Sequence, residues 1–399
     1  MGDRRTIVVV GAGIAGLTAA LTLAGAGFAV VLCERAPKLS EIGAGIQLSP
    51  NAGRILDRLG LGRMLAAAAT EPAAIDVLDG RAGRLITSIA TSTFKRRHGF
   101  PYRVIHRADL QSVLARAVSR TPAIRLELGT TFHSQLAKAD QVLVRIRGAD
   151  GGEVVTAAGV IGADGVWSGL RGSIAGAATP VATGRTAWRA IVPADAAGDA
   201  IATDRTTLWL GPEAHVVTYP VAQGAAINIV AIVAERWEKQ GWSAPGDRAS
   251  LLARFEHWSA QARAVLATPI SWQKFALLTV DPAAAWVAKR LALIGDSAHA
   301  MAPYIAQGAA MAIEDAAVLA DCMYGSDDIA GALLAYQRAR QERVVRVAET
   351  ARRTGERYHQ RGVSALARNA ALWLAGPRLV LRETDWIYRW QPPERTTPA

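Results

Sequence analysis

The feature that most constrains the fold is the stretch VVVGAGIAG at residues 8–16. The β-branched run at residues 6–10 has the composition of a strand that is buried on both faces. Gly11, Gly13 and Gly16 then form the pattern GxGxxG, and a helix-forming stretch follows. This order of strand, turn and helix brings a pyrophosphate close to the backbone at the helix N-terminus, where N–H groups attract negative charge.

A second apolar run, AVVLCE at residues 29–34, ends on Glu34. An acid at this distance from the glycines accepts the ribose hydroxyls of a dinucleotide, and its charge would repel a ribose 2′-phosphate. The pattern GxGxxG alone is weak evidence, because a glycine-rich coil or tight helix packing produces it too. The strand, helix, second strand and terminal acid in this order favour dinucleotide binding.

Two later segments repeat the design of a strand followed by a polar turn. Residues 160–173, VIGADGVWSGLRGS, place Asp164 at the end of a strand, and residues 291–296, LALIGD, do the same with Asp296. In an open α/β sheet, ligands bind outside the carboxyl ends of the strands. We therefore expect all three turns to meet at one edge, with a simple turn residue as the less favoured alternative for Asp164.

Composition excludes several classes of protein. The chain has 399 residues, of which 51% are hydrophobic and 20% charged, so that it can bury a large core in more than one domain. Its two cysteines provide no disulfide framework and no metal-ligand set, and we expect no metal and a cytoplasmic location. The net charge is +11, but the basic residues are scattered, which favours small anionic ligands over nucleic acid. The absence of an uninterrupted run of about 18 apolar residues predicts no membrane span.

Residues 183–234 differ in character, because short alternating strands are separated by glycine and proline turns. They predict an antiparallel sheet in a second domain. Within HVVTY, His215 and Tyr219 lie on one face of the strand and can both address a substrate, although a buried histidine beside a packed tyrosine would look the same. Arg103 and Arg189 are candidate partners for a substrate carboxylate, although arginine side chains often cover apolar edges.

Taken together, GAGIAG, GADGVWSGLR and GDSAHAMAPYIAQGAAMAIEDA (residues 295–316) resemble the single-component FAD-dependent aromatic hydroxylases, the para-hydroxybenzoate hydroxylase family. The stretches EIGAGIQLSPNA (residues 41–52) and HRADL (residues 106–110) are similar to its salicylate hydroxylase branch. The resemblance extends to about residue 350. The chain departs from the family pattern at Ala300, where proline is usual, and at Ser297, where alanine is usual.

The resemblance implies an α/β fold with a Rossmann-like FAD-binding domain of the GR2 type, an inserted antiparallel-sheet substrate domain and a C-terminal helical segment. We assign residues 1–72, 98–180 and 276–350 to the FAD-binding domain. The substrate domain takes residues 73–97 and 181–275. Residues 351–399 form C-terminal helices and a tail.

The resemblance also implies one FAD that is clasped at both ends. The expected cofactor-binding residues are Gly11, Gly13, Ala15, Gly16, Glu34, Arg35, Gln47, Arg107, Asp164, Asp296, Pro303, Gln307, Gly308 and Ala309. No second GxGxxG follows a strand, so that NADH or NADPH is expected to act as a transient co-substrate.

By the same resemblance, His215 is the general base and Tyr219 an orienting hydrogen-bond partner. Histidine, with an ordinary pKa of about 6.5, accepts a phenolic proton near neutral pH. The implied reaction uses NAD(P)H and dioxygen to hydroxylate a phenolic aromatic acid through a flavin hydroperoxide. This implied reaction is most like that of salicylate 1-hydroxylase. Family members that act on 3-hydroxybenzoate have glutamine in place of Pro303, which favours salicylate here.

Several alternatives stay open at this point. The substrate could be another hydroxybenzoate, a hydroxynicotinate, or a neutral aromatic or polyketide compound. A flavin-binding regulatory protein without turnover is an alternative from a different class. The expected partners are a small aromatic acid and dioxygen, and the chain is expected to be a monomer or a homodimer.

Overall fold

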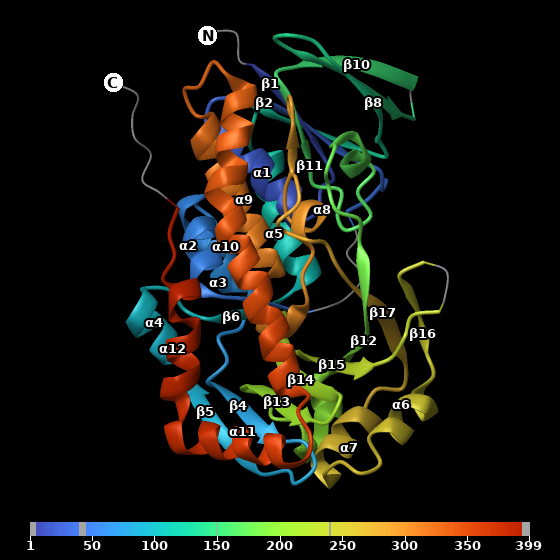
Figure 1. Cartoon of the computed structure of the whole chain (residues 1–399), viewed down its shortest axis with the longest axis vertical. Helices are drawn as coiled ribbons and strands as arrows, with labels where there is room; N and C mark the ends of the chain where they lie inside the picture. Colours follow the sequence, from blue (N-terminus) through green and yellow to red (C-terminus); the bar gives the residue numbers. More distant parts are fainter. Residues whose placement is uncertain (1–4, 40–44, 150, 239–240, 393–399) are drawn as a thin grey trace.

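The computed structural model describes residues 5–39, 45–149, 151–238 and 241–392; the tail predicted at residues 391–399 lies outside them from residue 393 on. A six-stranded sheet forms the upper part of the molecule (Figure 1). Its strands run parallel except for the antiparallel edge strand β18. Their order is β18 (Val287–Ala288), β19 (Leu291–Leu293), β11 (Gly159–Gly162), β1 (Thr6–Val10), β2 (Ala29–Glu34) and β7 (Ile124–Leu128).

An eight-stranded sheet forms the lower part. Its order is β16 (Ser243–Gly246), β17 (Trp272–Thr279), β12 (Val181–Pro193), β15 (Ala226–Ala234), β14 (Ala214–Val221), β13 (Thr206–Gly211), β4 (Ala74–Asp79) and β5 (Leu85–Ala90). Neighbouring strands are antiparallel except β13 and β4, which pair in parallel. The prediction of an antiparallel sheet is therefore correct for the segment on which it was based. The parallel pair arises because β4 joins from a distant part of the chain.

Two small sheets complete the strands. One has the order β10 (Gly151–Ala157), β9 (Val142–Gly148) and β8 (Thr131–Ala137), and the other pairs β3 (Gly45–Leu48) with β6 (Arg103–His106). β17 belongs to the eight-stranded sheet up to Thr279, past the boundary at residue 275 that the sequence suggested. The domain boundaries themselves stay a prediction.

The helices cover both sheets. Around the six-stranded sheet lie α1 (Ile14–Gly25), α2 (Pro50–Arg58), α3 (Gly62–Ala68), α5 (Arg107–Ser119), α8 (Asp296–His299) and α9 (Gly308–Met323). The outer face of the eight-stranded sheet packs on α6 (Arg248–Arg254) and α7 (Ala260–Ala267), and α4 (Ser92–His98) precedes β6. Short 3₁₀ turns are η1 (Leu170–Ser173), η2 (Ala194–Ala200), η3 (Ala222–Gly224) and η4 (Pro303–Ile305).

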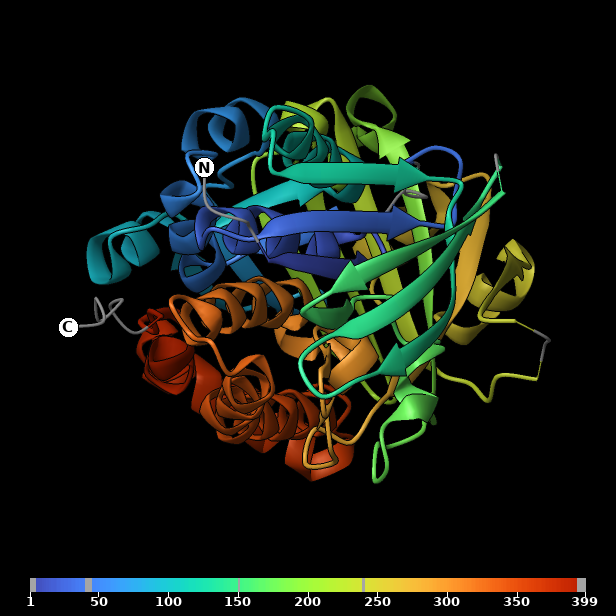
Figure 2. The same ribbon diagram turned by 90° about the horizontal axis from the view of Figure 1, so that it is seen from above.

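The C-terminal helices are α10 (Ile329–Tyr358), α11 (Gly362–Ala375) and α12 (Pro377–Tyr388). The long α10 runs from the six-stranded sheet down to the eight-stranded sheet, and seen from above these helices gather on one side (Figures 1 and 2). In the part of the chain that the structure describes, no helix has both the length and the apolar character needed to cross a bilayer.

Candidate functional site

The three polar turns meet at the carboxyl edge of the six-stranded sheet, as predicted. Gly11 has a φ of +101°, and a Cβ atom there would lie 2.5 Å from the backbone oxygen of Ala163. The third turn touches the first, because a Cβ on Gly295 would lie 3.2 Å from the Cβ of Ala15. Arg171 joins the second turn to the third by donating from Nε to the backbone oxygen of Ser297 at 2.9 Å.

The N-terminus of α1 is open for an anion. Its N-cap residue, Gly13, makes no side-chain hydrogen bond to the first turn, and that turn contains no acidic residue. A Cβ on Gly16 would lie 1.7 Å from the backbone oxygen of Gly11, so that only glycine permits this close packing. The geometry fits the pyrophosphate of a dinucleotide, whose charge the helix N-terminus stabilises.

We call the three turns and the N-terminus of α1 the cradle. Glu34 and Asp164 lie at its edges. Glu34 ends β2, and its carboxylate accepts hydrogen bonds from the backbone N–H groups of Ala12, at 2.8 Å, and Ala36, at 2.9 Å. The next residue, Arg35, is exposed. Asp164 accepts from the N–H of Gly169 at 2.9 Å through Oδ2, while its buried Oδ1 has no hydrogen-bond partner among the described residues. Asp164 therefore stabilises its own turn, as the alternative predicted, and its role in cofactor binding stays a prediction.

Asp296 begins the short helix α8 and is exposed at the edge of the sheet. Its carboxylate makes no hydrogen bond or ion pair among the described residues, whereas its backbone oxygen accepts from Arg171 at 3.3 Å. Ser297, which stands where the family usually has alanine, has partners for its hydroxyl. The hydroxyl lies 2.6 Å from the backbone oxygens of both Gly162 and Ile294. Ala300 has φ −48° and ψ 132°, a conformation close to the one that proline would impose.

The loop from Pro303 to Gly308 lies against the substrate sheet and the helices. Ala306 has a φ of +53°, a left-handed conformation that costs a non-glycine residue energy and often marks a functional loop. Gly308 and Ala309 form the uncapped N-terminus of α9. Gln307 is buried, and its amide donates to the Ser49 hydroxyl at 3.0 Å and accepts from the Asn51 amide at 3.1 Å. A contribution of Gln307 to cofactor binding would therefore come from its backbone.

A buried ionic network behind this loop was not foreseen from the sequence. His299 lies 2.6 Å from Asp315 Oδ2, and Arg340 donates from Nε to Asp315 Oδ1 at 2.8 Å. Burial would raise the pKa of Asp315, but His299 and Arg340 together lower it to about 2. Glu314 pairs with Arg340 and Arg343 at 2.7 Å each. The signal for this network in the sequence was the acidic pair Glu314 and Asp315 within an apolar stretch. Nothing near this pair in the sequence indicated its cationic partners.

The inner face of the eight-stranded sheet, on the side away from α6 and α7, forms a surface that we call the wall. Strand register places Arg189, Val230 and Val217 in one row across β12, β15 and β14, and Asn228 and Tyr219 in the next. The wall faces β3, since a Cβ on Gly45 would lie 2.2 Å from the Tyr219 ring, and Asn228 Oδ1 accepts from the N–H of Gly45 at 2.9 Å. Gln47, also on β3, accepts a hydrogen bond from the Tyr102 hydroxyl at 2.7 Å.

The two predicted catalytic side chains lie on this wall. Burial raises the pKa of the Tyr219 hydroxyl, which the charge of Arg189 partly opposes. Tyr219 is therefore a neutral hydrogen-bonding group. His215 faces the loop that carries Tyr304, with 5.6 Å between the ring centroids, and burial lowers its pKa to about 3. His215 is thus a neutral ring near pH 7, with a pKa below the ordinary value of about 6.5 on which its predicted role was based.

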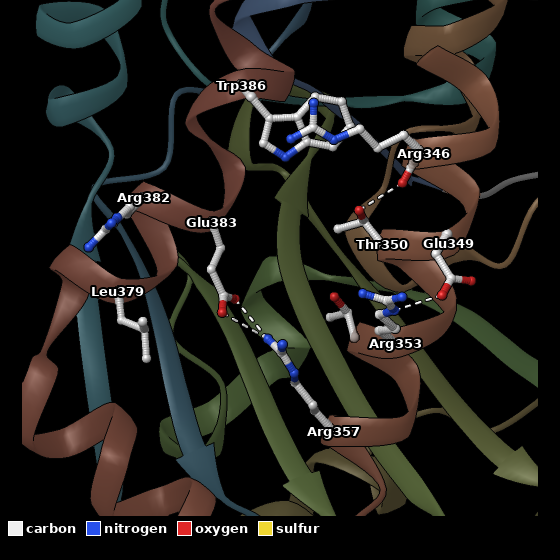
Figure 3. Close-up of a pocket in the computed structure, with 10 residues that line it drawn as sticks. Arg346, Glu349, Thr350, Arg353, Arg357, Leu379, Arg382, Glu383 and Trp386 are labelled. Carbon is white, nitrogen blue, oxygen red and sulfur yellow. Dashed lines mark hydrogen bonds and ion pairs between the residues drawn. The ribbon is translucent and has the colours of Figure 1, made fainter. Parts of the chain in front are cut away.

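A separate groove of about 680 Å³ lies between α10 and α12 (Figure 3). Its arginines are largely engaged, since Arg357 pairs with Glu383 at 2.9 Å and Arg346 lies 3.9 Å from the centroid of the Trp386 ring. None of the predicted site residues lines it. These contacts tie the C-terminal helices to each other.

Replacing Asp296 by alanine is expected to weaken FAD binding by about 1–3 kcal/mol, because a polar group of the bound FAD would be left without its hydrogen-bond partner. The flavin content of the purified protein and its dissociation constant would measure the loss. Asp140→Ala, at an exposed position in a distant turn, is the matched control. A variant of Asp296 that retains full and equally tight flavin would remove Asp296 from the site.

Comparison with known proteins agrees with this geometry. The family described as FAD binding domain matches residues 4–351. The chain is 35% identical over 387 residues to 3-hydroxybenzoate 6-hydroxylase of Klebsiella oxytoca, with 96% of each chain covered. It is 34% identical to 6-hydroxynicotinate 3-monooxygenase of Bordetella bronchiseptica, covering 87% of this chain and 90% of the relative.

Among solved structures, a salicylate hydroxylase substrate complex superposes with a TM-score of 0.81 at 28% identity, covering 98% of this chain and 96% of the other. The glycine-rich turn, the open N-terminus of α1 and the free carboxylate of Asp296 fit an FAD at the carboxyl edge of the sheet. The chain therefore belongs to the FAD-dependent aromatic hydroxylases, the single-component monooxygenases whose FAD-binding domain it shares.

Proposed function

We propose that this enzyme uses NADH or NADPH and dioxygen to hydroxylate a phenolic aromatic acid of the hydroxybenzoate or hydroxynicotinate class. The names of the relatives support this class of substrate. Salicylate and 3-hydroxybenzoate are the two leading candidates, because Pro303 favours the first and the relatives with 33–35% identity support the second. The cytoplasmic location and the monomeric or homodimeric state also stay predictions.

The observation that carries the proposal is a half-buried arginine on the wall. Arg189 makes no hydrogen bond or ion pair among the described residues, and its Nε is buried without a partner. Its guanidinium lies over the Phe275 ring, 5.0 Å from the centroid. Burial lowers its pKa, and the nearby charge of Arg107 adds to this effect. A cation whose Nε is buried without a partner is costly, so that an anionic ligand is the natural partner.

The spacing on the wall suits a substituted benzoate. Arg189 lies on β12, two strands away from His215 and Tyr219 on β14, which corresponds to about 10 Å across the sheet. A ring that places its carboxylate near Arg189 can point its phenolic oxygen toward β14. The apolar side chains Val217 and Val230 then lie beneath the ring.

His215, Tyr219 and the loop with Pro303 and Tyr304 have different roles in the proposed reaction. Bound FAD, once reduced, supplies the activated oxygen. His215 withdraws the phenolic proton while the ring attacks the activated oxygen, and the loss of this proton makes the ring a better nucleophile. Tyr219 orients the phenolic oxygen by a hydrogen bond. Pro303 and Tyr304, in the loop beside the wall, shield the reacting groups from water.

The test compares acids with their uncharged amides. The purified protein is expected to form hydroxylated product from salicylate or 3-hydroxybenzoate, with salicylamide and 3-hydroxybenzamide much poorer. Arg189→Met should raise KM for the acid about tenfold or more, through loss of a charge-assisted hydrogen bond worth about 1.5–3 kcal/mol. KM for the amide should change little.

Product must be measured together with NADH consumption, because reduced flavin also reacts with dioxygen without hydroxylating the substrate. Arg263→Met, at an exposed arginine on α7, is the matched control. Equal turnover of acid and amide would favour the alternative of a neutral substrate. A flavin-containing protein that oxidises NADH with none of these compounds would favour the regulatory alternative.

A further inference from the structure

His215 has a partner that the reaction described above does not use. Its Nδ1 lies 2.9 Å from Nε2 of His359, which follows the last residue of α10. Both residues are buried, with 4% of His215 and 8% of His359 exposed. The two rings also contact Tyr304, with centroid distances of 5.6 and 5.5 Å. The pair therefore joins the wall to the C-terminal end of α10 through a buried hydrogen bond between residues 144 apart in the chain.

A hydrogen bond between two neutral imidazoles needs one proton between the facing nitrogens. If His215 carries it on Nδ1, its Nε2 has a free lone pair and can accept a proton. If His359 carries it, His215 must hold its own proton on Nε2 and cannot act as a base there. No described residue hydrogen-bonds Nε2 of His215, which leaves that nitrogen available to a substrate.

The surroundings keep both rings neutral. Burial lowers the pKa of His215 to about 3, and the charge of Arg185 on β12 adds to this. Burial likewise lowers the pKa of His359 to about 2, together with His215, Arg185 and Arg368 of α11. Among the described residues, Tyr304 of η4 and Tyr358 of α10 also contact these rings. A neutral His359 can therefore accept a hydrogen bond at Nε2 from the Nδ1–H of His215 throughout the working pH range.

We propose that His359 is a positioning residue for the hydroxylation, which holds His215 in the tautomer with Nε2 unprotonated and accepts its Nδ1–H when the phenolic proton arrives. The inference rests on the proposed function of His215. In the transfer, the phenolic O–H bond breaks and an N–H bond forms at Nε2. The charged ring that results keeps a hydrogen bond to a neutral acceptor, and such charge-assisted bonds are the stronger ones.

The end of α10 is fixed in a way that suits this role. Arg368 donates to the backbone oxygens of Arg357 at 2.7 Å and Tyr358 at 2.9 Å, which satisfies carbonyls at the helix terminus. Arg357 is tied to Glu383 of α12 across the groove (Figure 3). The packing is tight at Gly355, where a Cβ would lie 2.4 Å from the Tyr304 ring. Helices α11 and α12 therefore hold His359 against His215.

The experiment compares two substitutions of His359 in the FAD-loaded enzyme. His359→Leu removes the acceptor, whereas His359→Gln retains a side-chain oxygen that can accept from Nδ1–H. We expect the leucine variant to lower the hydroxylation rate and the product formed per NADH about tenfold, with KM and flavin content unchanged. The glutamine variant should stay within about threefold of wild type. His257→Leu, at a histidine whose side chain is 80% exposed, is the control.

A pH series and a double variant separate positioning from structural damage. The leucine variant should recover hydroxylation as the pH rises toward the phenol pKa of about 10, because the substrate then loses its proton without help. In a His215→Ala background, His359→Leu should have no further effect on coupling.

The outcomes distinguish the two levels of the proposal. If His215→Ala leaves coupling intact, the proposed function of His215 is wrong and this inference is wrong with it. If His215→Ala uncouples the enzyme and His359→Leu does not, only the role of His359 is overturned. Should the leucine variant lose flavin or fold poorly, the glutamine variant decides, and a tenfold loss there would contradict the proposal.

Discussion

His215→Ala is expected to slow ring hydroxylation about a hundredfold or more, the usual scale for removing a positioned general base. Flavin content should stay near one per chain, because His215 lies on the substrate wall and not among the turns that form the cofactor cradle. NADH oxidation should continue and end in hydrogen peroxide. Raising the pH toward the phenol pKa of about 10 should restore part of the lost hydroxylation. Product formed per NADH consumed, across a pH series, measures all of this.

The pH dependence of hydroxylation by the wild-type enzyme can also be predicted. With a pKa lowered to about 3, His215 stays unprotonated over the whole range from pH 5 to 9, so that its titration should not appear as an acid limb near pH 6.5. Tyr219→Phe keeps the ring and removes the hydroxyl, and should raise KM more than it lowers coupling. Unchanged coupling in His215→Ala at neutral pH would show that this histidine is only part of the wall.

Arg340→Met is expected to lower the free energy of unfolding by about 3–5 kcal/mol, the usual cost of breaking a buried ion pair from one side. Arg340 has 0% of its side chain exposed and faces both Glu314 and Asp315. Without it, two carboxylates remain buried. Asp315 then keeps His299 and the backbone N–H of Gly295, and Glu314 keeps Asn51 and Arg343. The thermal midpoint and the temperature of flavin release of the FAD-loaded protein measure the loss.

The matched control lies on the same helix. Arg353 pairs with Glu349 on the surface, with 65% of its side chain exposed, and Arg353→Met should cost less than about 1 kcal/mol. The pKa of Asp315 is lowered to about 2 in the folded protein, so that this carboxylate stabilises the fold above its ordinary pKa. The contribution is lost as the pH falls through 3.8 toward 2. The difference between Arg340→Met and wild type should therefore be constant from pH 5 to 8 and shrink in acid. Equal midpoints at pH 7 would contradict the assigned role.

What the sequence predicted well depended on local geometry. The strands at residues 6–10 and 29–34 were predicted at the bounds observed, because glycine spacing and β-branched runs constrain the backbone over a few residues. His215 and Tyr219 share a face because side chains alternate along any strand. The meeting of the three turns followed from the rule for parallel sheets and needed no knowledge of side-chain contacts.

What the sequence did not predict depends on partners that lie far apart in the chain. His359 meets His215 across 144 residues, and Asn51 occupies the amide of Gln307 across 256. No periodicity encodes which histidine or asparagine will arrive at a given place. The parallel pairing of β4 with β13 is of the same kind, since the packing of the whole sheet decides it.

The strand order of the six-stranded sheet has a consequence for the biogenesis of the enzyme. β11 lies between β1 and β19, so that the sheet is completed only by a strand at Leu291–Leu293. During synthesis, the first glycine turn leaves the ribosome long before the strand that carries its counterpart at Asp296. Strand pairs between such distant segments form slowly, and the apolar edges of the unpaired strands stay exposed until they do. Flavin capture should accordingly be a late event, and nascent chains that end before α8 should not retain FAD.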